Sequence, residues 1–368
     1  MTALKDIYSP KFIGDLANSL KKVYPSLDRD IFVKDIFKKS WIQFELKERM
    51  SHISDVMIVH TPISFSKRVI VLKKLINNLR GIGEENFNFP YMFLPEIIQK
   101  TGNDNFEESM NAIEFITVFT SAEFVIRHFY LSDFTNTLNQ MKVWSKHKDP
   151  MVRRLASEGS RPLLPWGIGV PKIKSNPEYH LPILENLWND RNETVRRSVA
   201  NHLNDISKIN PELSWNFAKD KFGHSNETDK SLRHSLRTLL KRGHTEILNS
   251  FDYDTKWKPK IFHLKLEKDK IKMGDKIKFS IRIVNQSNKP VKLRLEYIIS
   301  FYLANKKYGK KVFQLGEKLL NPKEDFIKLK SHSFAPITTR TYYPGIHHIA
   351  LVINGNEIVI QSFELKEK

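Results

Sequence analysis

The hydrophobic pattern changes its period part-way along this chain of 368 residues. In the first two-thirds, apolar residues recur at helical spacing, as in residues 12–23, where Ser9-Pro10 supplies a start signal. Residues 70–79 have the same spacing, and prolines separate such runs from one another. This part of the chain is therefore predicted to consist of consecutive helices.

Beyond Trp257-Lys258-Pro259 the period becomes two. Residues 276–283 alternate strictly between polar and apolar side chains, and so do residues 291–297. Near the end, two apolar runs flank Asn354-Gly355-Asn356, which is a strong signal for a β-hairpin. About seven short strands in roughly 110 residues indicate a small β-sandwich of immunoglobulin-like type.

A weak internal repeat occurs in the helical part. Segments that start at Asp149 and Asp190 both lead into a Val-Arg-Arg unit, and the two units begin at Val152 and Val195, 43 residues apart. Residues 231–237 resemble a degenerate third copy. This offset is typical of paired-helix HEAT units, which bury their apolar faces by stacking and so form a curved groove. Two unrelated amphipathic helices that share a tripeptide are the alternative.

These patterns together predict a multidomain chain, α then β. We expect an α-solenoid of HEAT-like helical repeats in residues 1–256, followed by an immunoglobulin-like β-sandwich in residues 257–368.

The formal charge of +19 points to a polyanionic partner. Nucleic acid is the leading candidate and an anionic membrane surface is the second. Residues 259–368 contain 22 Lys and Arg against 10 Asp and Glu, a surplus of 12, so the smaller β-domain carries most of the charge. We expect this domain to touch the polyanion; a charged, solvated sheet face is the alternative.

Several classes of site are excluded by what the chain lacks. It has no cysteine, which rules out disulfides and thiolate metal sites. Phosphate-loop, HExxH and GxSxG signatures are missing, and His347-His348 is expected to point to opposite faces of a strand, so neither a metal nor a cofactor is predicted. Neither a secretory signal nor an apolar run of about 20 residues is present, and we expect a cytoplasmic protein without a membrane span.

The candidate chemistry lies in residues 156–167. Glu158 is expected directly after the helix that contains Val152, in a segment stiffened by glycine and proline. Arg161 offers a phosphate donor, and Trp166 offers a flat surface for stacking against a base or sugar. A carboxylate among DNA-binding cations makes sense if the substrate itself is cationic. A helix-terminating turn in which Glu158 pairs locally with Arg161 is the alternative.

The run of residues 153–167, Arg-Arg-Leu-Ala-Ser-Glu-Gly-Ser-Arg-Pro-Leu-Leu-Pro-Trp-Gly, resembles the central signature of the AlkC family of alkylpurine DNA glycosylases. The resemblance extends upstream to residues 119–127 and downstream to residues 198–208, and the β-domain resembles the subgroup with an immunoglobulin-like domain. It implies HEAT-like repeats that wrap damaged DNA and excise 3-methyladenine. By motif position it places the active-site carboxylates at Glu123, Glu158 and Asp205.

The resulting hypothesis is a monofunctional DNA glycosylase that acts, as a monomer, on duplex DNA containing cationic alkylated bases. Glu158 and Asp205 are expected to stabilise the cation and position water, with Glu123 assisting, and Trp166 should lie near the lesion. The resemblance also suggests that the duplex is bent rather than the base taken into a deep pocket. A non-catalytic HEAT scaffold for nucleic acid and a protein–protein adaptor remain as alternatives. The candidates for contacts with DNA phosphates are Arg153, Arg154, Arg161, Arg196 and Arg197.

Overall fold

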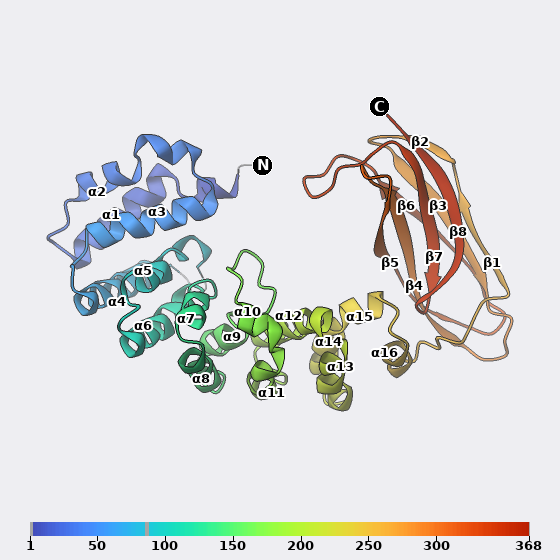
Figure 1. Ribbon diagram of the computed structural model, residues 1–368, viewed down its shortest axis with the longest axis horizontal. Helices are drawn as coiled ribbons and strands as arrows, with labels where there is room; N and C mark the ends of the chain where they lie inside the picture. Colours follow the sequence, from blue (N-terminus) through green and yellow to red (C-terminus); the bar gives the residue numbers. More distant parts are fainter. Residues whose placement is uncertain (1–2, 85–87, 368) are drawn as a thin grey trace. The chain divides into compact units, whose positions relative to one another are not determined.

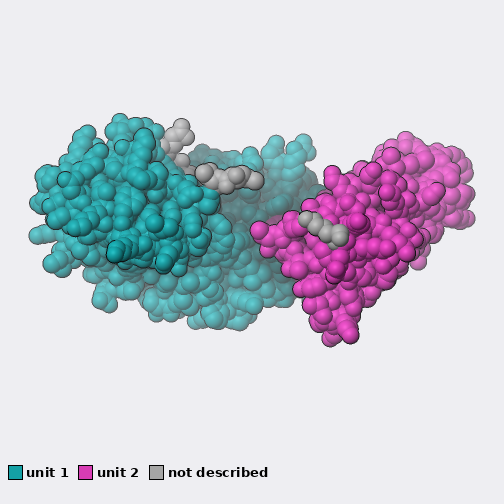
Figure 2. Space-filling model, turned by 90° about the horizontal axis from the view of Figure 1, so that it is seen from above, with its two compact units in different colours: residues 1–236 teal, residues 237–368 magenta. Residues whose placement is uncertain are grey.

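The computed structural model describes residues 3–84 and 88–367. The chain divides into two compact units, Met1–Leu236 and Arg237–Lys368 (Figure 2). The domain boundary expected after residue 256 falls inside the second unit, between its last helix and its first strand.

The first unit is helical (Figure 1), and the expected helices at residues 12–23 and 70–79 lie within α1 and α4. Ser9 caps α1 by accepting a hydrogen bond from the backbone NH of Phe12, as the Ser-Pro start signal predicts. Among the described residues no helix has the length and apolar character needed to cross a bilayer. The α-helices of this unit are α1 (Pro10–Val23), α2 (Arg29–Ile36), α3 (Leu46–Val59), α4 (Phe65–Gly81), α5 (Leu94–Thr101), α6 (Phe106–Phe119), α7 (Ile126–Ser132), α8 (Phe134–Trp144), α9 (Pro150–Glu158), α10 (Pro171–Ser175), α11 (Leu181–Leu187), α12 (Glu193–Ile209), α13 (Pro211–Ala218) and α14 (Asn226–Ser235).

The two Val-Arg-Arg units lie on α9 and α12, which pack side by side, and α12 packs in turn against α14, where most of the third copy lies. Val152 and Val195 are fully buried, and α8, α11 and α13 cover the same row of helices. The aspartates do not correspond as the sequence suggested. Asp149 caps α9, whereas the equivalent cap of α12 is Asn192, and Asp190 forms an ion pair with Arg153. The stacked helix pairs nevertheless confirm a helical repeat.

The second unit contains two short helices, α15 (Arg237–Lys241) and α16 (Thr245–Ser250), and two β-sheets. One sheet has the strand order β1-β3-β6 and the other β2-β8-β7-β4-β5, and a single hydrophobic core between them takes residues from both. All strand pairs are antiparallel except β2 with β8. The strands are β1 (Ile261–Leu266), β2 (Lys270–Lys272), β3 (Lys276–Val284), β4 (Val291–Tyr302), β5 (Tyr308–Leu320), β6 (Asp325–Ser333), β7 (Gly345–Ile353) and β8 (Asn356–Lys366).

The predicted hairpin joins β7 to β8. Asn354 and Gly355 have positive φ angles of 47° and 84°, as a tight two-residue turn requires. The Asn354 side chain donates to the carbonyl of Asp254 at 3.0 Å, and Asn356 donates to that of Thr255 at 2.8 Å. The segment before β1 is therefore fixed to the hairpin, which is one reason why the second unit begins earlier than its first strand.

Candidate active site

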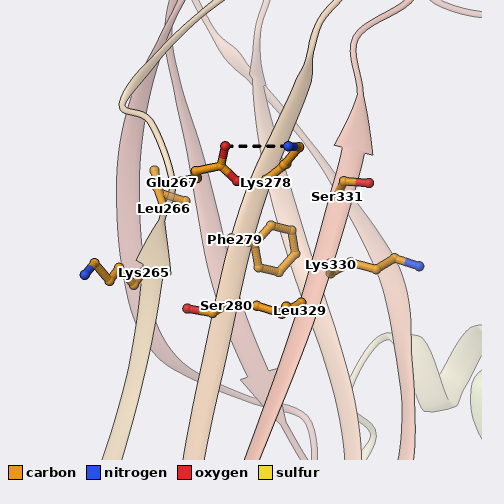
Figure 3. A pocket seen from close by; sticks show the side chains of 9 residues that line it. All are labelled: Lys265, Leu266, Glu267, Lys278, Phe279, Ser280, Leu329, Lys330 and Ser331. Carbon is orange, nitrogen blue, oxygen red and sulfur yellow. Dashed lines mark ion pairs between the residues drawn. The ribbon is translucent and has the colours of Figure 1, made fainter.

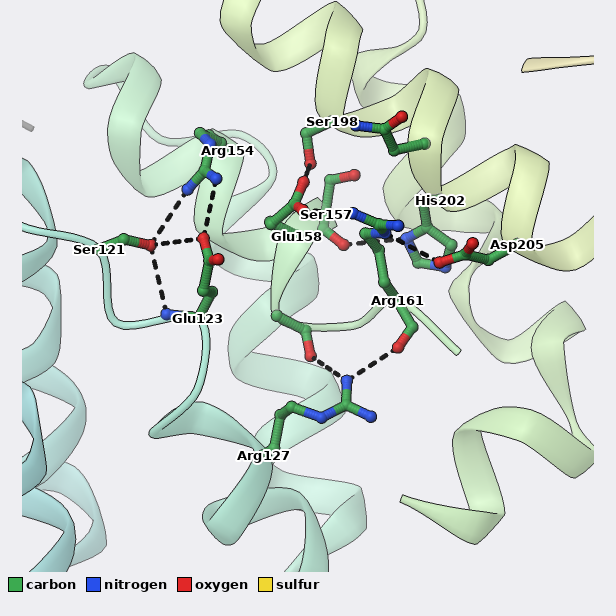
Figure 4. A network of polar contacts seen from close by, with 12 residues as sticks. Ser121, Glu123, Arg127, Arg154, Ser157, Glu158, Arg161, Ser198, His202 and Asp205 are labelled. Carbon is green, nitrogen blue, oxygen red and sulfur yellow. Dashed lines mark hydrogen bonds and ion pairs between the residues drawn. The ribbon is translucent and has the colours of Figure 1, made fainter. Parts of the chain in front are cut away.

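A cavity of about 410 Å³ opens on the helical unit where the loops after α6 and α9 meet. Its lining is largely aromatic and aliphatic, and two carboxylates and two guanidinium groups interrupt it. Figure 4 shows these four charged side chains, which belong to Glu123, Arg154, Glu158 and Arg161. Mixed apolar walls with a few convergent polar groups are typical of a binding site. The lining residues are Phe89, Met92, Ser121, Glu123, Phe124, Arg154, Glu158, Arg161, Leu164, Pro165 and Trp166.

Glu158 is the last residue of α9, not the first residue after it. It is 6% exposed, and both of its carboxylate oxygens are bonded. Arg161 Nη1 donates to Oε1 at 2.6 Å, and Ser198 Oγ on α12 donates to Oε2 at 2.6 Å. The local pairing of Glu158 with Arg161 is therefore present, but it belongs to a larger network that reaches the neighbouring repeat.

Arg161 joins two of the three predicted carboxylates. Its Nε donates to Asp205 Oδ2 at 2.9 Å while its Nη1 is bonded to Glu158. Asp205 also accepts from Lys208 Nζ at 3.0 Å and is 1% exposed, so it contacts Arg161 from the α12 side and is not part of the cavity wall. Burial works against the charged form of Arg161, but the Glu158 and Asp205 carboxylates together raise its pKa above the ordinary value.

The turn after Glu158 depends on a glycine. A Cβ on Gly159 would come within 2.4 Å of the Ile126 side chain and within 3.1 Å of the Leu155 carbonyl oxygen. No larger residue fits there without displacing α7 from α9. The turn therefore packs closely against α7, and Glu158, the last residue of α9, lines the cavity.

Arg127 holds the loop that follows. The residue is 1% exposed, and its guanidinium donates to the backbone carbonyl of Arg161 at 2.8 Å (Figure 4). It also donates to the carbonyls of Gly159 at 3.1 Å and Ile168 at 2.5 Å. Burial lowers the pKa of Arg127 to about 10, so the side chain remains protonated at neutral pH. One buried cation thus fixes both ends of the loop that carries Arg161 and Trp166.

Glu123 reaches the same cavity from the loop between α6 and α7. Its Oε2 accepts from Ser121 Oγ at 2.7 Å and from Arg154 Nη2 at 2.8 Å. Arg154 lies on α9 one turn before Glu158, so this ion pair connects the loop after α6 to α9. Each of the three predicted carboxylates therefore has at least one cationic partner.

The other predicted phosphate ligands lie outside the cavity. Arg153 forms a two-point ion pair with Asp190, at 2.5 and 2.9 Å, and also donates to two backbone carbonyls, so its position favours a role in joining α9 to the turn before α12. Arg196 donates to the Asp190 carbonyl at 2.6 Å, whereas Arg197 is exposed and pairs with Glu193. Contact of these three arginines with DNA stays a prediction.

Trp166 forms the aromatic wall and is 59% exposed. Its backbone lies in the left-handed region, with a φ of 64°, which is uncommon for a residue with a bulky side chain. A strained residue that exposes a large indole at the edge of a cavity suggests a contact surface for a ligand.

Two histidines are fully buried beneath this site. His202 on α12 bonds through Nδ1 to the Ser157 carbonyl at 2.9 Å; since a carbonyl can only accept, Nδ1 carries the proton. Burial, helped by the charge on Arg161, lowers the pKa of His202 to about 3. Burial also lowers the pKa of His180, whose ring lies 5.9 Å from that of His202. Both imidazoles are therefore neutral near pH 7.

The second unit presents lysines on one of its sheets. Figure 3 shows Lys265, Lys278 and Lys330 around a shallow depression of about 580 Å³ on β1, β3 and β6. Lys278 lies 3.5 Å from Glu267, while Lys330 belongs to the edge strand β6. Among the residues that the structure describes, no group of three or more His, Cys, Asp or Glu side chains could hold a metal ion.

Comparison with known proteins finds matches to both units. A family described as DNA alkylation repair enzyme matches residues 102–239, and the family of the C-terminal Ig-like domain of the uncharacterised protein YhaZ matches residues 260–367. The chain is 35% identical over 355 residues to the uncharacterised protein YhaZ of Bacillus subtilis (strain 168), covering 96% of this chain and 97% of that protein. Its structure is similar to that of the alkylpurine DNA glycosylase AlkC of Pseudomonas fluorescens bound to DNA containing an abasic site analog, with a TM-score of 0.92 and 34% identity over 99% of this chain and 100% of that one.

Proposed function

Because this chain belongs to the AlkC family, whose helical repeats and C-terminal Ig-like domain it shares over almost its whole length, we propose that it is a monofunctional DNA glycosylase. Its substrate is duplex DNA with cationic alkylated bases, chiefly 3-methyladenine, from which it hydrolyses the N-glycosidic bond.

One observation carries this proposal: Glu123, Glu158 and Trp166 line one cavity on the helical unit. Alkylation at N3 gives adenine a positive charge, so the base can leave without prior protonation. As the glycosidic bond breaks, positive charge moves onto the deoxyribose, as it does in sugar hydrolysis. The site therefore needs an aromatic surface to hold a cationic base and an anion to stabilise the charge on the sugar. Carboxylates beside an exposed aromatic side chain can supply both.

The size of the electrostatic effect is sufficient for such a reaction. An anion about 4 Å from the developing cation, at an effective dielectric near 20, stabilises it by up to ~4 kcal/mol. That corresponds to roughly a thousandfold in rate. Since Glu123 and Glu158 already have arginine partners, the effective gain from each is smaller than this upper bound.

We propose different roles for the three carboxylates because they occupy different positions around the cavity. Glu158 faces the cavity and is the group proposed to stabilise the cation and position water, with Glu123 assisting from the opposite loop. Asp205 lies behind Arg161 and acts through it. Asp205 accepts from Nε of Arg161 and so holds the guanidinium in place. Arg161 then bonds Oε1 of Glu158 through Nη1, and Oε2 accepts from the neutral hydroxyl of Ser198.

The replacement of Glu158 by glutamine tests this role. The amide oxygen can still accept from Arg161 and the amide nitrogen can donate to Ser198, so the shape of the site is kept while its charge is lost. We expect release of 3-methyladenine from methylated duplex DNA to fall by ~10²- to 10³-fold. Glu212→Gln, on an exposed position of α13, should keep the wild-type rate. Excision by Glu158→Gln at the wild-type rate would remove Glu158 from the mechanism.

The same assay separates the alternatives. A scaffold would bind DNA with a steep salt dependence but release no base, and a protein–protein adaptor would do neither. The absence of freed 3-methyladenine at stoichiometric protein would therefore overturn the proposed glycosylase.

A further inference from the structure

Lys47 connects an early helix to the rim of the cavity. It lies in the first turn of α3, and its Nζ donates to the backbone carbonyl of Trp166, 119 residues later, at 2.8 Å. The same ammonium lies 5.4 Å from the centroid of the Phe124 ring, within the range of a cation–π contact. Phe124 and Trp166 are both walls of the cavity, and they come from different loops.

We infer that Lys47 is a positioning residue for the reaction, which holds Trp166 and Phe124 at a fixed separation across the opening of the cavity. This role rests on the glycosylase function proposed above, because it is through the two aromatic walls that Lys47 would affect the bound lesion.

The backbone at Trp166 requires such support. Its φ of 64° is unfavourable for a tryptophan, and the exposed indole gains little from burial. The adjacent residues are held by the buried Arg127: a Cβ on Gly167 would lie 3.0 Å from the Arg127 side chain, and the Ile168 carbonyl accepts from Arg127 Nε. Lys47 supplies the remaining constraint, at the carbonyl of the strained residue itself.

The position of Lys47 in α3 also indicates that its ammonium acts on the cavity loops and does not stabilise α3. A cation in the first turn of a helix opposes the helix dipole. The neighbouring Glu45 and Glu48 form the capping box that stabilises this end of α3, and Lys47 contributes nothing to it. Its ammonium instead points away from α3 to two partners on the cavity loops.

Three variants test this role. Lys47→Met keeps most of the aliphatic stem and removes the donor, Lys47→Arg restores a cation, and Lys172→Met removes a lysine that lies 4.4 Å over Phe134, away from the cavity. We expect the single-turnover rate of base release to fall roughly tenfold in Lys47→Met, as when one ordering hydrogen bond is lost. Lys47→Arg should recover most of the rate, and Lys172→Met should match the wild type. An unchanged rate in Lys47→Met overturns the role.

Two further readouts separate positioning from a direct phosphate contact. A phosphate contact would reduce the slope of log affinity against log salt by about 0.9 in Lys47→Met, whereas positioning leaves that slope unchanged. If Lys47 acts through the two aromatic walls, Lys47→Met should slow a variant that carries both Phe124→Ala and Trp166→Ala no further. Additive losses, or a smaller slope with a normal rate, contradict the role.

Fluorescence gives an answer that does not depend on the proposed function. If the wild-type protein releases no base, the proposed glycosylase function is wrong, but the effect of Lys47 on the position of Trp166 can still be measured. The measurement is the acrylamide quenching of Trp166 fluorescence, obtained as the difference between each protein and the same protein with Trp166→Phe. Greater quenching of this component in Lys47→Met than in Lys172→Met supports the tether. Equal quenching overturns it.

Discussion

Replacing His202 by asparagine should reduce the dependence of stability on acidity. The imidazole is fully buried, and its Nδ1 proton is bonded to the Ser157 carbonyl, a bond that the asparagine amide can reproduce. Burial lowers the pKa of His202 to about 3, whereas in the unfolded chain it has the ordinary value of about 6.5. Between these two values the unfolded state binds a proton that the folded state does not, so acid favours unfolding.

The magnitude follows from the difference in pKa. His202 has no effect on the free energy of unfolding above about pH 6.5. Below that pH it lowers this free energy by ~1.4 kcal/mol per pH unit, until the pH reaches about 3. At about pH 5 the contribution of His202 is a loss of ~2 kcal/mol. Arg161 and Arg127, the cations near the ring, oppose protonation, and the Ser157 carbonyl only partly offsets them.

Urea unfolding followed by tryptophan fluorescence measures this loss. Five of the six tryptophans lie in residues 1–236, so the signal reports mainly on the helical unit. From about pH 8 to about pH 5, the wild-type protein should lose ~2 kcal/mol more than His202→Asn. Other histidines with a lowered pKa, such as His52 and His128, titrate in both proteins and cancel in the difference. Equal losses in the two proteins would refute the buried neutral imidazole.

Asp205→Asn removes one carboxylate from the buried Arg161. It should therefore slow base release at least tenfold with little change in DNA affinity, and lower the free energy of unfolding by ~3–5 kcal/mol. A normal excision rate would show that Asp205 does not act through Arg161. A chain of residues 1–236 should bind DNA more weakly, with a salt slope that is smaller by about 0.9 for every lost phosphate contact, because residues 237–368 carry 27 Lys and Arg against 13 Asp and Glu. An unchanged slope in a folded chain of this length would show that the basic unit makes no contact with phosphate.

Local signals in the sequence predicted the elements well. Ser9 caps a helix, and Asn354-Gly355 forms a hairpin turn, because both structures depend on residues adjacent in the chain. The hydrophobic pattern predicts about seven strands, and eight are present among the described residues. The strand β2 has only three residues, which is too short for alternation to reveal it. Ile70 fits the helical spacing of α4 but is 52% exposed, because spacing alone does not set the width of the buried face.

The candidate site was harder to predict because it depends on partners far apart in sequence. Charge alone predicts phosphate contacts for the arginines, whereas the fold pairs Arg161 with Glu158 and Asp205, and Arg153 with Asp190, 37 residues away. Charge in a sequence does not distinguish a solvated guanidinium from one that carboxylates surround. Arg127 lies in residues 119–127, which resemble the AlkC family, but its three carbonyl partners follow only from the folded loop.

The three hydrogen bonds of Arg127 all end on backbone carbonyls, at Gly159, Arg161 and Ile168. These three bonds hold the backbone of the loop and do not depend on which side chains stand at the accepting positions. Leu164 lines the cavity, so a substitution there reshapes the wall while the end of α9 keeps Glu158 in place. Under the proposed function, substitutions within this one loop would change which lesion the protein prefers, provided that Arg127 is retained.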